Sequence, residues 1–316
     1  MWTSGLALVP MPTTYAYLGP RGTFSEAALL GMPVSANADL VPAHSVPVAL
    51  ELVRSGEVTG ALIPIENSVE GSVPSTLDEL SHGERLEIVQ ETAIPVTFGL
   101  LVRPGTQLSD ITRVATHPHA HAQCVEWLHQ NLPGVHVLPA MSTAAAAAEL
   151  DAEAPYQAAI CSTAAARHYG LEVLHDDIGD HDAAWTRFVL VQRVGARAAS
   201  TGNDKTTVSL FIHEDHPGAL LEILTEFAVR GVNLTRIESR PTKRQLGDYF
   251  FSIDFAGHID DERVGEAMKG LHRICADVKF LGSYPRHDAT NSEVRPSVQD
   301  TAFVEAREWL ARLRQG

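Results

Sequence analysis

Chemically capable side chains follow several apolar runs in residues 1–194, each where a run ends and a helix can begin. The set is Thr23, Ser25, Glu66, Asn67, Ser68, His117, His119, His121, Ser142, Thr143, Ser162, Thr163, Thr186 and Arg187. In open α/β sheets, ligands bind beyond the carboxyl ends of the strands, where helix N-termini present unpaired N–H groups to anions. The pattern therefore predicts a cleft for a small anionic molecule.

Several other interpretations of these residues remain open. Taken singly, Ser142, Thr143, Ser162 and Thr163 are explained more simply as helix N-caps. The histidines at 117 and 121 share a helix face, but two histidines without a third ligand indicate zinc only weakly, so we expect no metal. No G-x-S-x-G elbow, P-loop or G-x-G-x-x-G fingerprint occurs, so neither a serine hydrolase nor a dinucleotide enzyme is indicated, and we expect no cofactor.

The elements that position these residues alternate in type, which is typical of parallel α/β sheets. Strands are expected at 15–20, 58–65, 87–102 (a pair broken near Pro95), 111–118, 135–140, 157–162 and 187–194. Helices are expected at 23–30, 120–132, 142–152 and 163–170. Each predicted helix follows a predicted strand, so the polar residues fall at the junctions.

The pattern changes after a small, polar segment at 195–204, which we interpret as a linker. The next segments read as strand 205–215, helix 216–231, strands 232–241 and 248–257, helix 261–275 and strand 277–285. This βαββαβ order predicts a ferredoxin-like domain over 205–285. The tail, 286–316, ends in an amphipathic helix with Phe303, Trp309, Leu310 and Leu313 near one face, expected to dock on the body or on a neighbouring subunit.

Composition excludes some classes of function. The formal net charge of −15 argues against a nucleic-acid partner. Three widely spaced cysteines form no CxxC pair, so we expect a reducing compartment and no disulfide framework. The chain has no run of eighteen apolar residues and its N-terminus lacks a basic signal-peptide region, so we expect no membrane association and a cytoplasmic location.

Six motifs resemble prephenate dehydratases in order and spacing over residues 14–194. They are YLGPRGTFSEAAL (17–29), IPIENSVEGSV (63–73), HPHAHAQC (117–124), STAAAA (142–147), AAICSTAAARHYGL (158–171) and WTRFVLV (185–191). The resemblance implies an α/β catalytic region of two lobes, similar to type II periplasmic binding proteins, with the substrate in the cleft between the lobes. It also implies a lyase of phenylalanine biosynthesis that decarboxylates and dehydrates prephenate to phenylpyruvate.

The same resemblance assigns roles to residues. The family's Thr-Arg-Phe signature matches residues 186–188, which implies that Thr186 donates a hydrogen bond to the leaving hydroxyl and that the Arg187 guanidinium suits a carboxylate. Glu66 or His117 is expected to supply the proton. The expected substrate-binding residues are Thr23, Ser25, Asn67, Ser68, His117, Gln123, Ser142, Thr143 and Ser162. Many relatives carry an asparagine where this chain has Ala183-Ala184, and Asp180 or Asp182 is a possible substitute.

The 205–285 segment resembles an ACT domain. GALL (218–221) and ESRP (238–241) match the two motifs that mark phenylalanine binding in dehydratases. The expected effector site contains Gly218, Ala219, Leu220, Leu221, Asn233, Glu238, Ser239, Arg240 and Pro241. Glu238 and Arg240 lie two apart on one strand face, so we also expect them to form an ion pair. ACT domains commonly pair side by side, which implies a homodimer or homotetramer with allosteric inhibition by L-phenylalanine.

Two other functions remain open at this point. An arogenate dehydratase would carry almost the same motifs and make phenylalanine directly. A non-catalytic amino-acid-sensing protein would keep the fold without the reaction, although the intact ENS, STA and TRF motifs count against it. Turnover of prephenate and arogenate separates all three.

Overall fold

The computed structural model describes residues 13–180, 184–213, 216–243, 247–288 and 294–315. The chain forms two compact units, each assembled from two separate stretches of sequence. The first contains Met1–Leu62 and Val96–Asp182, and the second contains Ile63–Pro95 and Ala183–Gly316.

The first stretch of the first unit begins with parallel strands. β1 (Thr14–Leu18) pairs with β2 (Asp39–Ala43) and with the start of β3 (Gly60–Asn67). Helices α1 (Phe24–Leu30) and α2 (Val46–Ser55) follow β1 and β2, and η1 (Pro33–Ser35) lies between α1 and β2. Hydroxyl caps fix where the helices begin, because Thr23 and Ser45 each accept a hydrogen bond from a backbone N–H three residues later.

The second stretch of the first unit is a five-stranded sheet of order β10-β6-β9-β7-β8. Its elements are β6 (Gly99–Val102), η2 (Leu108–Asp110), β7 (Arg113–Thr116), α4 (Pro118–Ala122), α5 (Val125–Asn131), β8 (His136–Pro139), α6 (Thr143–Ala148), β9 (Ala158–Cys161), α7 (Ala164–Tyr169) and β10 (Glu172–His175). β7 is parallel to β8 and β9, but β6 is antiparallel to β9 and β10. The sheet is therefore mixed: the expected parallel pairs are present, and β6 and β10 add antiparallel pairs that were not predicted.

The helix predicted over 120–132 is two helices. α4 ends at Ala122 and α5 begins at Val125. The break has a local cause: the carboxylate of Asp180 accepts hydrogen bonds from the N–H groups of Glu126 (2.9 Å) and Trp127 (3.0 Å). These two donors would otherwise point along a continuous helix, so the side chain caps a new helix start.

In the second unit, the remainder of β3 leads into β4 (Gly71–Ser72), α3 (Pro74–His82) and β5 (Leu86–Pro95). β11 (Trp185–Arg193) pairs antiparallel with β5 along its whole length, from Trp185 opposite Pro95 to Arg193 opposite Leu86. Within this unit, β11 lies between β3 and β5 in the sheet, and β4 also pairs with β3. The centre of β11, from Phe188 to Val191, is buried.

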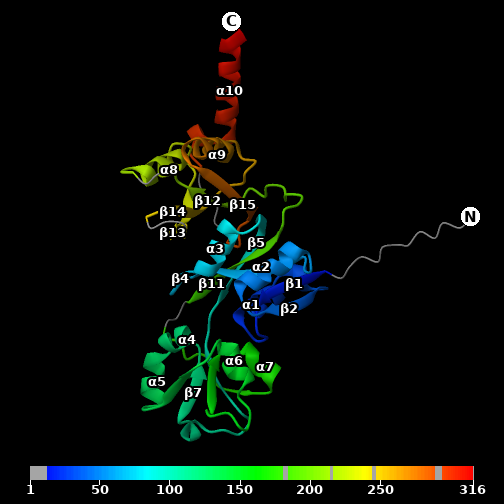
Figure 1. Cartoon of the computed structure of the whole chain (residues 1–316), viewed down its shortest axis with the longest axis vertical. Helices are drawn as coiled ribbons and strands as arrows, with labels where there is room; N and C mark the ends of the chain where they lie inside the picture. The colour runs from blue at the N-terminus through cyan, green and yellow to red at the C-terminus, as the bar shows by residue number, and fades with distance from the viewer. Residues whose placement is uncertain (1–12, 181–183, 214–215, 244–246, 289–293, 316) are drawn as a thin grey trace, which may run out of the picture. The chain divides into compact units, whose positions relative to one another are not determined.

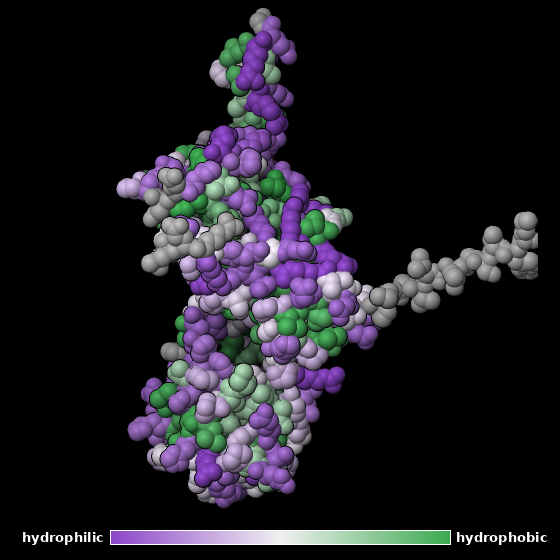
Figure 2. Space-filling model, in the orientation of Figure 1, coloured by the Kyte–Doolittle hydropathy of each residue, from purple (hydrophilic) through white to green (hydrophobic). Residues whose placement is uncertain are grey.

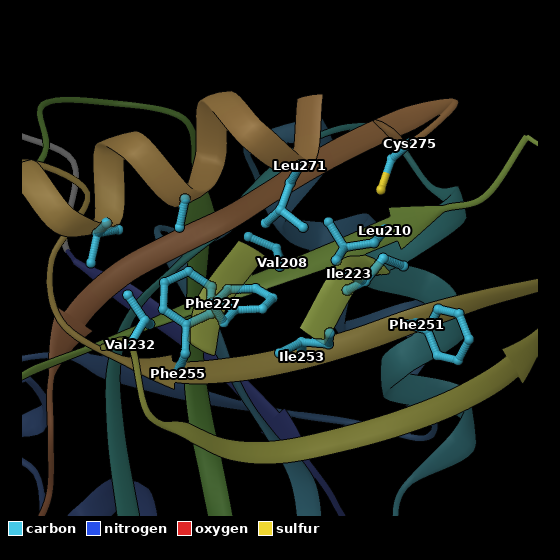
Figure 3. Close-up of a cluster of buried hydrophobic side chains, with 12 residues drawn as sticks. Val208, Leu210, Ile223, Phe227, Val232, Phe251, Ile253, Phe255, Leu271 and Cys275 are labelled. Atoms are coloured by element: carbon cyan, nitrogen blue, oxygen red, sulfur yellow. The ribbon is translucent and has the colours of Figure 1, made fainter. Parts of the chain in front are cut away.

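The C-terminal half of the second unit has the predicted βαββαβ order. The elements are β12 (Asp204–Phe211), α8 (Ala219–Ala228), β13 (Leu234–Pro241), β14 (Tyr249–Ala256), α9 (Glu262–Ile274) and β15 (Asp277–Pro285), and the sheet order is β13-β14-β12-β15. α8 and α9 cover one face of this sheet (Figure 1). Val208, Ile223, Phe227, Phe255 and Leu271 form the core between them (Figure 3). The predicted end of the first strand includes residues 214 and 215, which lie outside the described residues.

The other face of the same sheet is polar and buried. Thr207, Ser209, Ser252 and Asp254 alternate with the core residues, as the two-residue period of a strand requires, and each is 0% exposed. Ser209 Oγ lies 2.7 Å from the hydroxyl of Ser81 on α3. The polar face is therefore packed against the β5 and α3 part of the same unit.

The tail contains η3 (Pro296–Val298) and α10 (Asp300–Gln315). Arg307 of α10 forms an ion pair with Glu262 of α9. Trp309 is 57% exposed and Leu313 60% exposed, so docking on the chain's own body extends only to the first turns. Figure 2 shows hydrophobic residues on the solvent-facing surface of this helix. Within the described part of the chain, no helix combines the length and apolar character needed to cross a membrane.

Candidate active site

In the second unit, a hydrogen bond joins two predicted site residues that are 119 positions apart in the sequence. Asn67, the last residue of β3, donates from Nδ2 to Thr186 Oγ1 of β11 at 2.8 Å. The amide orientation is fixed, because Asn67 Oδ1 accepts from the N–H groups of Val69 (2.8 Å) and Glu70 (2.9 Å). Thr186 Oγ1 therefore acts as an acceptor toward Asn67, and its own proton is left to donate to a bound molecule.

Two backbone contacts hold this pair in place. Ser68 N–H donates to the carbonyl of Trp185, and Trp185 N–H donates to Ser68 Oγ, each at 2.9 Å. The neighbouring Glu66 carboxylate lies 3.5 Å from Arg187 Nη1. The structure thus brings together five of the predicted site residues, and it does so by pairing the end of β3 with the start of β11. These five are residues 66–68 and 186–187.

Arg187 points into the protein. Its side chain is 9% exposed, and each of its three nitrogens has a protein acceptor. Nε donates to Glu91 (2.7 Å), Nη1 to Asp254 (2.6 Å) and Nη2 to the Tyr284 hydroxyl (2.9 Å). Asp254 and Tyr284 belong to β14 and β15. The sequence analysis predicted that Arg187 binds a substrate carboxylate. In the structure, its carboxylate partners are Glu91 and Asp254 of the chain itself.

The electrostatics of this cluster keep its acids ionised. Burial by itself would raise the pKa of Glu91, but hydrogen bonding from His287 and the charges of Arg187 and Lys205 lower it to about 2. Burial likewise opposes ionisation of Asp254, and the guanidinium groups of Arg236 and Arg187 outweigh it and lower the pKa of that carboxyl far below its usual range. The cluster is therefore a set of paired buried charges at neutral pH.

Several of the predicted site residues of the first unit lie at helix starts. Thr23 Oγ1 accepts from Glu26 N–H (3.3 Å) at α1, and Ser142 Oγ accepts from Ala145 N–H (3.0 Å) at α6. The capping interpretation is thereby confirmed for Ser142. Ser162 Oγ accepts from Ala164 N–H at 3.3 Å, whereas the Thr163 side chain makes no capping bond and Thr143 is the first residue of α6.

The other predicted residues of this unit have different surroundings. His117 caps α4 through Nδ1, which accepts from the N–H of His119 at 3.3 Å. Ser25 and Gln123 are each 5% exposed. The carboxylate of Asp180 is engaged in capping α5, and Asp182 lies outside the described residues. As substrate contacts, all of these residues stay predictions.

Sequence reasoning missed one buried acid in the first unit. The Glu26 carboxylate accepts from Tyr17 Oη (2.9 Å) and from the N–H of Gly22 (2.6 Å), and it lies 3.1 Å from His168 Nε2. Burial and the hydrogen bond to Glu26 raise the pKa of Tyr17. The available signal was an acid inside the small and apolar run FSEAALL, where a charge needs partners.

The predicted effector residues of α8 line a hollow. A cavity of about 390 Å³ is bounded by Ile212, His216, Gly218, Ala219, Leu220, Leu221, Leu224 and Phe251. Gly218 has φ +98°, a backbone conformation that favours glycine, and it caps the start of α8. The hollow is mainly apolar, with backbone N–H groups at one end, which suits an amino acid with an apolar side chain.

The two charged side chains of the ESRP segment (238–241) have other partners than predicted. Glu238 accepts a hydrogen bond from Ser72 at 3.2 Å, and Arg240 pairs with Asp78 of α3 at 3.1 Å. The predicted Glu238–Arg240 ion pair is therefore wrong, because each side chain finds a partner on β4 or α3 instead. Asn233 precedes β13 and is exposed, as are Ser239 and Pro241.

Comparisons with known proteins agree with this architecture. The prephenate dehydratase family matches residues 15–196 and the ACT domain family matches residues 206–273. A prephenate dehydratase of Mycobacterium tuberculosis is 47% identical over 309 residues, covering 95% of this chain and 94% of the relative. The crystal structure of an Arthrobacter aurescens prephenate dehydratase in complex with L-Phe is 52% identical, with a TM-score of 0.92 over 96% of this chain and 100% of that one.

A second solved structure shows that the fold extends beyond one activity. A protein described as a novel type of quorum-quenching acylase is 29% identical, with a TM-score of 0.74 over 86% of this chain and 97% of its own. Fold likeness alone therefore does not identify the reaction. The assignment depends on the higher identity and nearly complete coverage of the dehydratases.

The fold and domain pair define a class: an α/β dehydratase region joined to a C-terminal ACT domain. Within that class, the chain belongs to the prephenate dehydratase family. It is a lyase of the dehydratase type. The resemblance drawn from the six motifs and from the GALL and ESRP segments is confirmed.

Proposed function

We propose that this chain converts prephenate into phenylpyruvate, and that Thr186 with its partner Asn67 carries the reaction. Prephenate loses its ring carboxylate as carbon dioxide and its hydroxyl as water, and aromatisation drives both losses. The C–O bond breaks as the leaving oxygen accepts a hydrogen bond from Thr186, whose proton is directed away from Asn67 by the 2.8 Å contact. No oxidation state of a protein group changes, so the residues need only bind, orient and protonate.

A threonine is too weak an acid to deliver the proton by itself at neutral pH. Glu66 precedes Asn67 in β3 and is the proposed donor within the second unit, with its carboxylate on the Arg187 side of the strand, 3.5 Å from Arg187 Nη1. His117 is the alternative from the first unit. The two carboxylates of prephenate are proposed to bind residues at or near helix ends. These are Thr23, Ser25, Gln123, Ser142, Thr143 and Ser162, together with Ser68.

The effector proposed for the ACT domain is L-phenylalanine. The hollow beside α8 is apolar and large enough for its ring, and the backbone at Gly218 can approach its carboxylate. The Arthrobacter aurescens relative, described as a complex with L-Phe, supports this effector. We further propose a cytoplasmic homo-oligomer, a dimer or tetramer, that pairs through its ACT domains.

Purified protein mixed with prephenate at neutral pH, with phenylpyruvate followed by its absorbance in alkali, tests the proposal. Thr186→Ala should lower turnover at least about a hundredfold, of the order of 3 kcal/mol, because the hydrogen bond to the leaving oxygen is lost. Thr186→Ser keeps the hydroxyl and is the matched control, with most of the activity retained.

Arogenate, tested in parallel, decides between the two dehydratases. Faster turnover of arogenate would reassign the substrate. A folded protein inert toward both substrates would favour the amino-acid sensor, and near-normal turnover by Thr186→Ala would remove Thr186 from the mechanism.

A further inference from the structure

Thr186 and Arg187 are neighbours on β11, so their side chains point to opposite faces of the strand. Thr186 meets Asn67 at the end of β3. Arg187 is directed toward the ACT sheet, where Asp254 of β14 and Tyr284 of β15 accept its hydrogen bonds. One dipeptide thus joins the proposed catalytic hydroxyl to the regulatory domain.

The acceptors of Arg187 are themselves held firmly. The Asp254 carboxylate also accepts from Arg236 Nε (3.0 Å) and Nη2 (2.8 Å) and from Thr207 Oγ1 (2.9 Å). The hydroxyls of Thr207 and Tyr284 lie 2.6 Å apart. Both Asp254 and Tyr284 are 0% exposed. The Arg187 guanidinium therefore contacts a network of buried side chains that hydrogen bonds to one another hold in place.

The same two layers touch at a second place. Lys205 of β12 donates to both Glu91 oxygens at 3.0 Å, and Glu91 of β5 also accepts from Arg187 Nε. Gly282 of β15 lies so close to β5 that an added Cβ would collide with the carbonyl oxygen of Ile88. Backbone contact and ion pairs together leave β11 little freedom to shift relative to the ACT sheet.

A direct role in binding a substrate carboxylate would conflict with these contacts. To reach a ligand, Arg187 would have to release Asp254 and Glu91, which would leave two buried carboxylates short of a partner. Removing one member of a buried ion pair is strongly destabilising. The geometry favours a structural use of the guanidinium.

We propose that Arg187 is a positioning residue: by anchoring β11 to the ACT sheet through Asp254 and Tyr284, it sets the Thr186 hydroxyl against Asn67. The inference rests on the catalytic role proposed for Thr186. It also gives the ACT domain a direct route to the reaction, because Arg187 links any shift of β14 or β15 to β11.

Tyr284→Phe is the sharpest test, because it removes one hydrogen bond to Arg187 and leaves the ring and every charge in place. We expect kcat to fall about tenfold with KM for prephenate unchanged, because the lost hydrogen bond loosens the placement of the Thr186 hydroxyl, which acts in the transition state. Asp78→Asn is the control. It breaks another ion pair to the ACT sheet, with Arg240, that does not involve β11, and should leave kcat and KM as in wild type.

A double-mutant cycle supplies a readout that general destabilisation would not reproduce. If Tyr284 acts through Thr186, Tyr284→Phe should have no further effect on kcat in a Thr186→Ala background. An equal loss in both backgrounds would overturn the proposal, as would a rise in KM at constant kcat, which would mean that Arg187 binds substrate. Wild-type kcat in folded Tyr284→Phe would overturn it too.

Circular dichroism and thermal unfolding establish that each variant is folded. If Tyr284→Phe does not fold, Thr207→Ala, which removes the hydroxyl between Tyr284 and Asp254, is judged by the same criteria. The same variants distinguish the role of Thr186 from that of Arg187. Near-normal turnover by Thr186→Ala would overturn the proposed role of Thr186, whereas an inactive Thr186→Ala beside a fully active Tyr284→Phe would refute only the positioning role of Arg187.

Discussion

At the scale of single residues, the side-chain amide of Asn67 decides what the hydroxyl of Thr186 can do. Two backbone N–H groups hold Asn67 Oδ1, so only Nδ2 faces Thr186. The sequence predicted both residues from motifs, but their hydrogen bond joins positions 119 apart and depends on how β3 and β11 are placed. The partners of Arg187 were missed for the same reason, since Glu91, Asp254 and Tyr284 come from three further strands.

Exchanging that amide for a carboxylate should reverse the hydrogen bond. In Asn67→Asp the contacts to Val69 and Glu70 N–H can be kept, but the other oxygen would accept the proton of Thr186. We expect kcat to fall by about a hundredfold, close to the loss in Thr186→Ala, with the fold intact. Steady-state kinetics with prephenate and a circular dichroism spectrum check this. Turnover near wild type in Asn67→Asp would show that the direction of this hydrogen bond is immaterial.

At the scale of elements, the sequence predicted helices and strands well where the period of the apolar residues matches the face that packs against a core. The ACT strands and helices were predicted to within a few residues, because each shows a clear period around one core. β2, β4, β10, α2 and α3 were missed. β2 is a largely exposed strand containing Pro42, and proline also stands in the first turn of both helices, where it is tolerated because no N–H is needed.

Close contact between elements gives a second prediction. Gly282→Ala places a methyl group against the carbonyl of Ile88 and also strains a residue with φ +137°, so the free energy of unfolding should fall by about 3 kcal/mol. Gly202→Ala is the matched control in the same unit, since Gly202 has φ +82° with no atom within 4 Å of an added Cβ, and should cost about 1 kcal/mol. Urea unfolding midpoints measure both. Equal losses would mean that β15 has room to move away from β5.

At the scale of the whole molecule, one polypeptide carries a dehydratase region and an ACT domain, and the second unit contains part of the former and all of the latter. The polar face of the ACT sheet is buried against β5 and α3, and the opposite face carries α8 and its hollow. The sequence predicted a separate ACT domain after a linker, but the buried polar face could not be foreseen. Alternation marks two faces without stating which partner covers each one.

Regulation should therefore be separable from turnover by a change on the helix face alone. Leu220 is 38% exposed and lines the hollow, so Leu220→Asp would bring a carboxylate into the space proposed for the phenylalanine ring. We expect inhibition by phenylalanine to be lost while turnover without phenylalanine is unchanged. Val229→Asp, at the far end of α8 and outside the hollow, is the control and should stay inhibited. Titrating phenylalanine into the prephenate assay, with calorimetry for direct binding, measures both variants; inhibition that persists in Leu220→Asp would place the effector at another site.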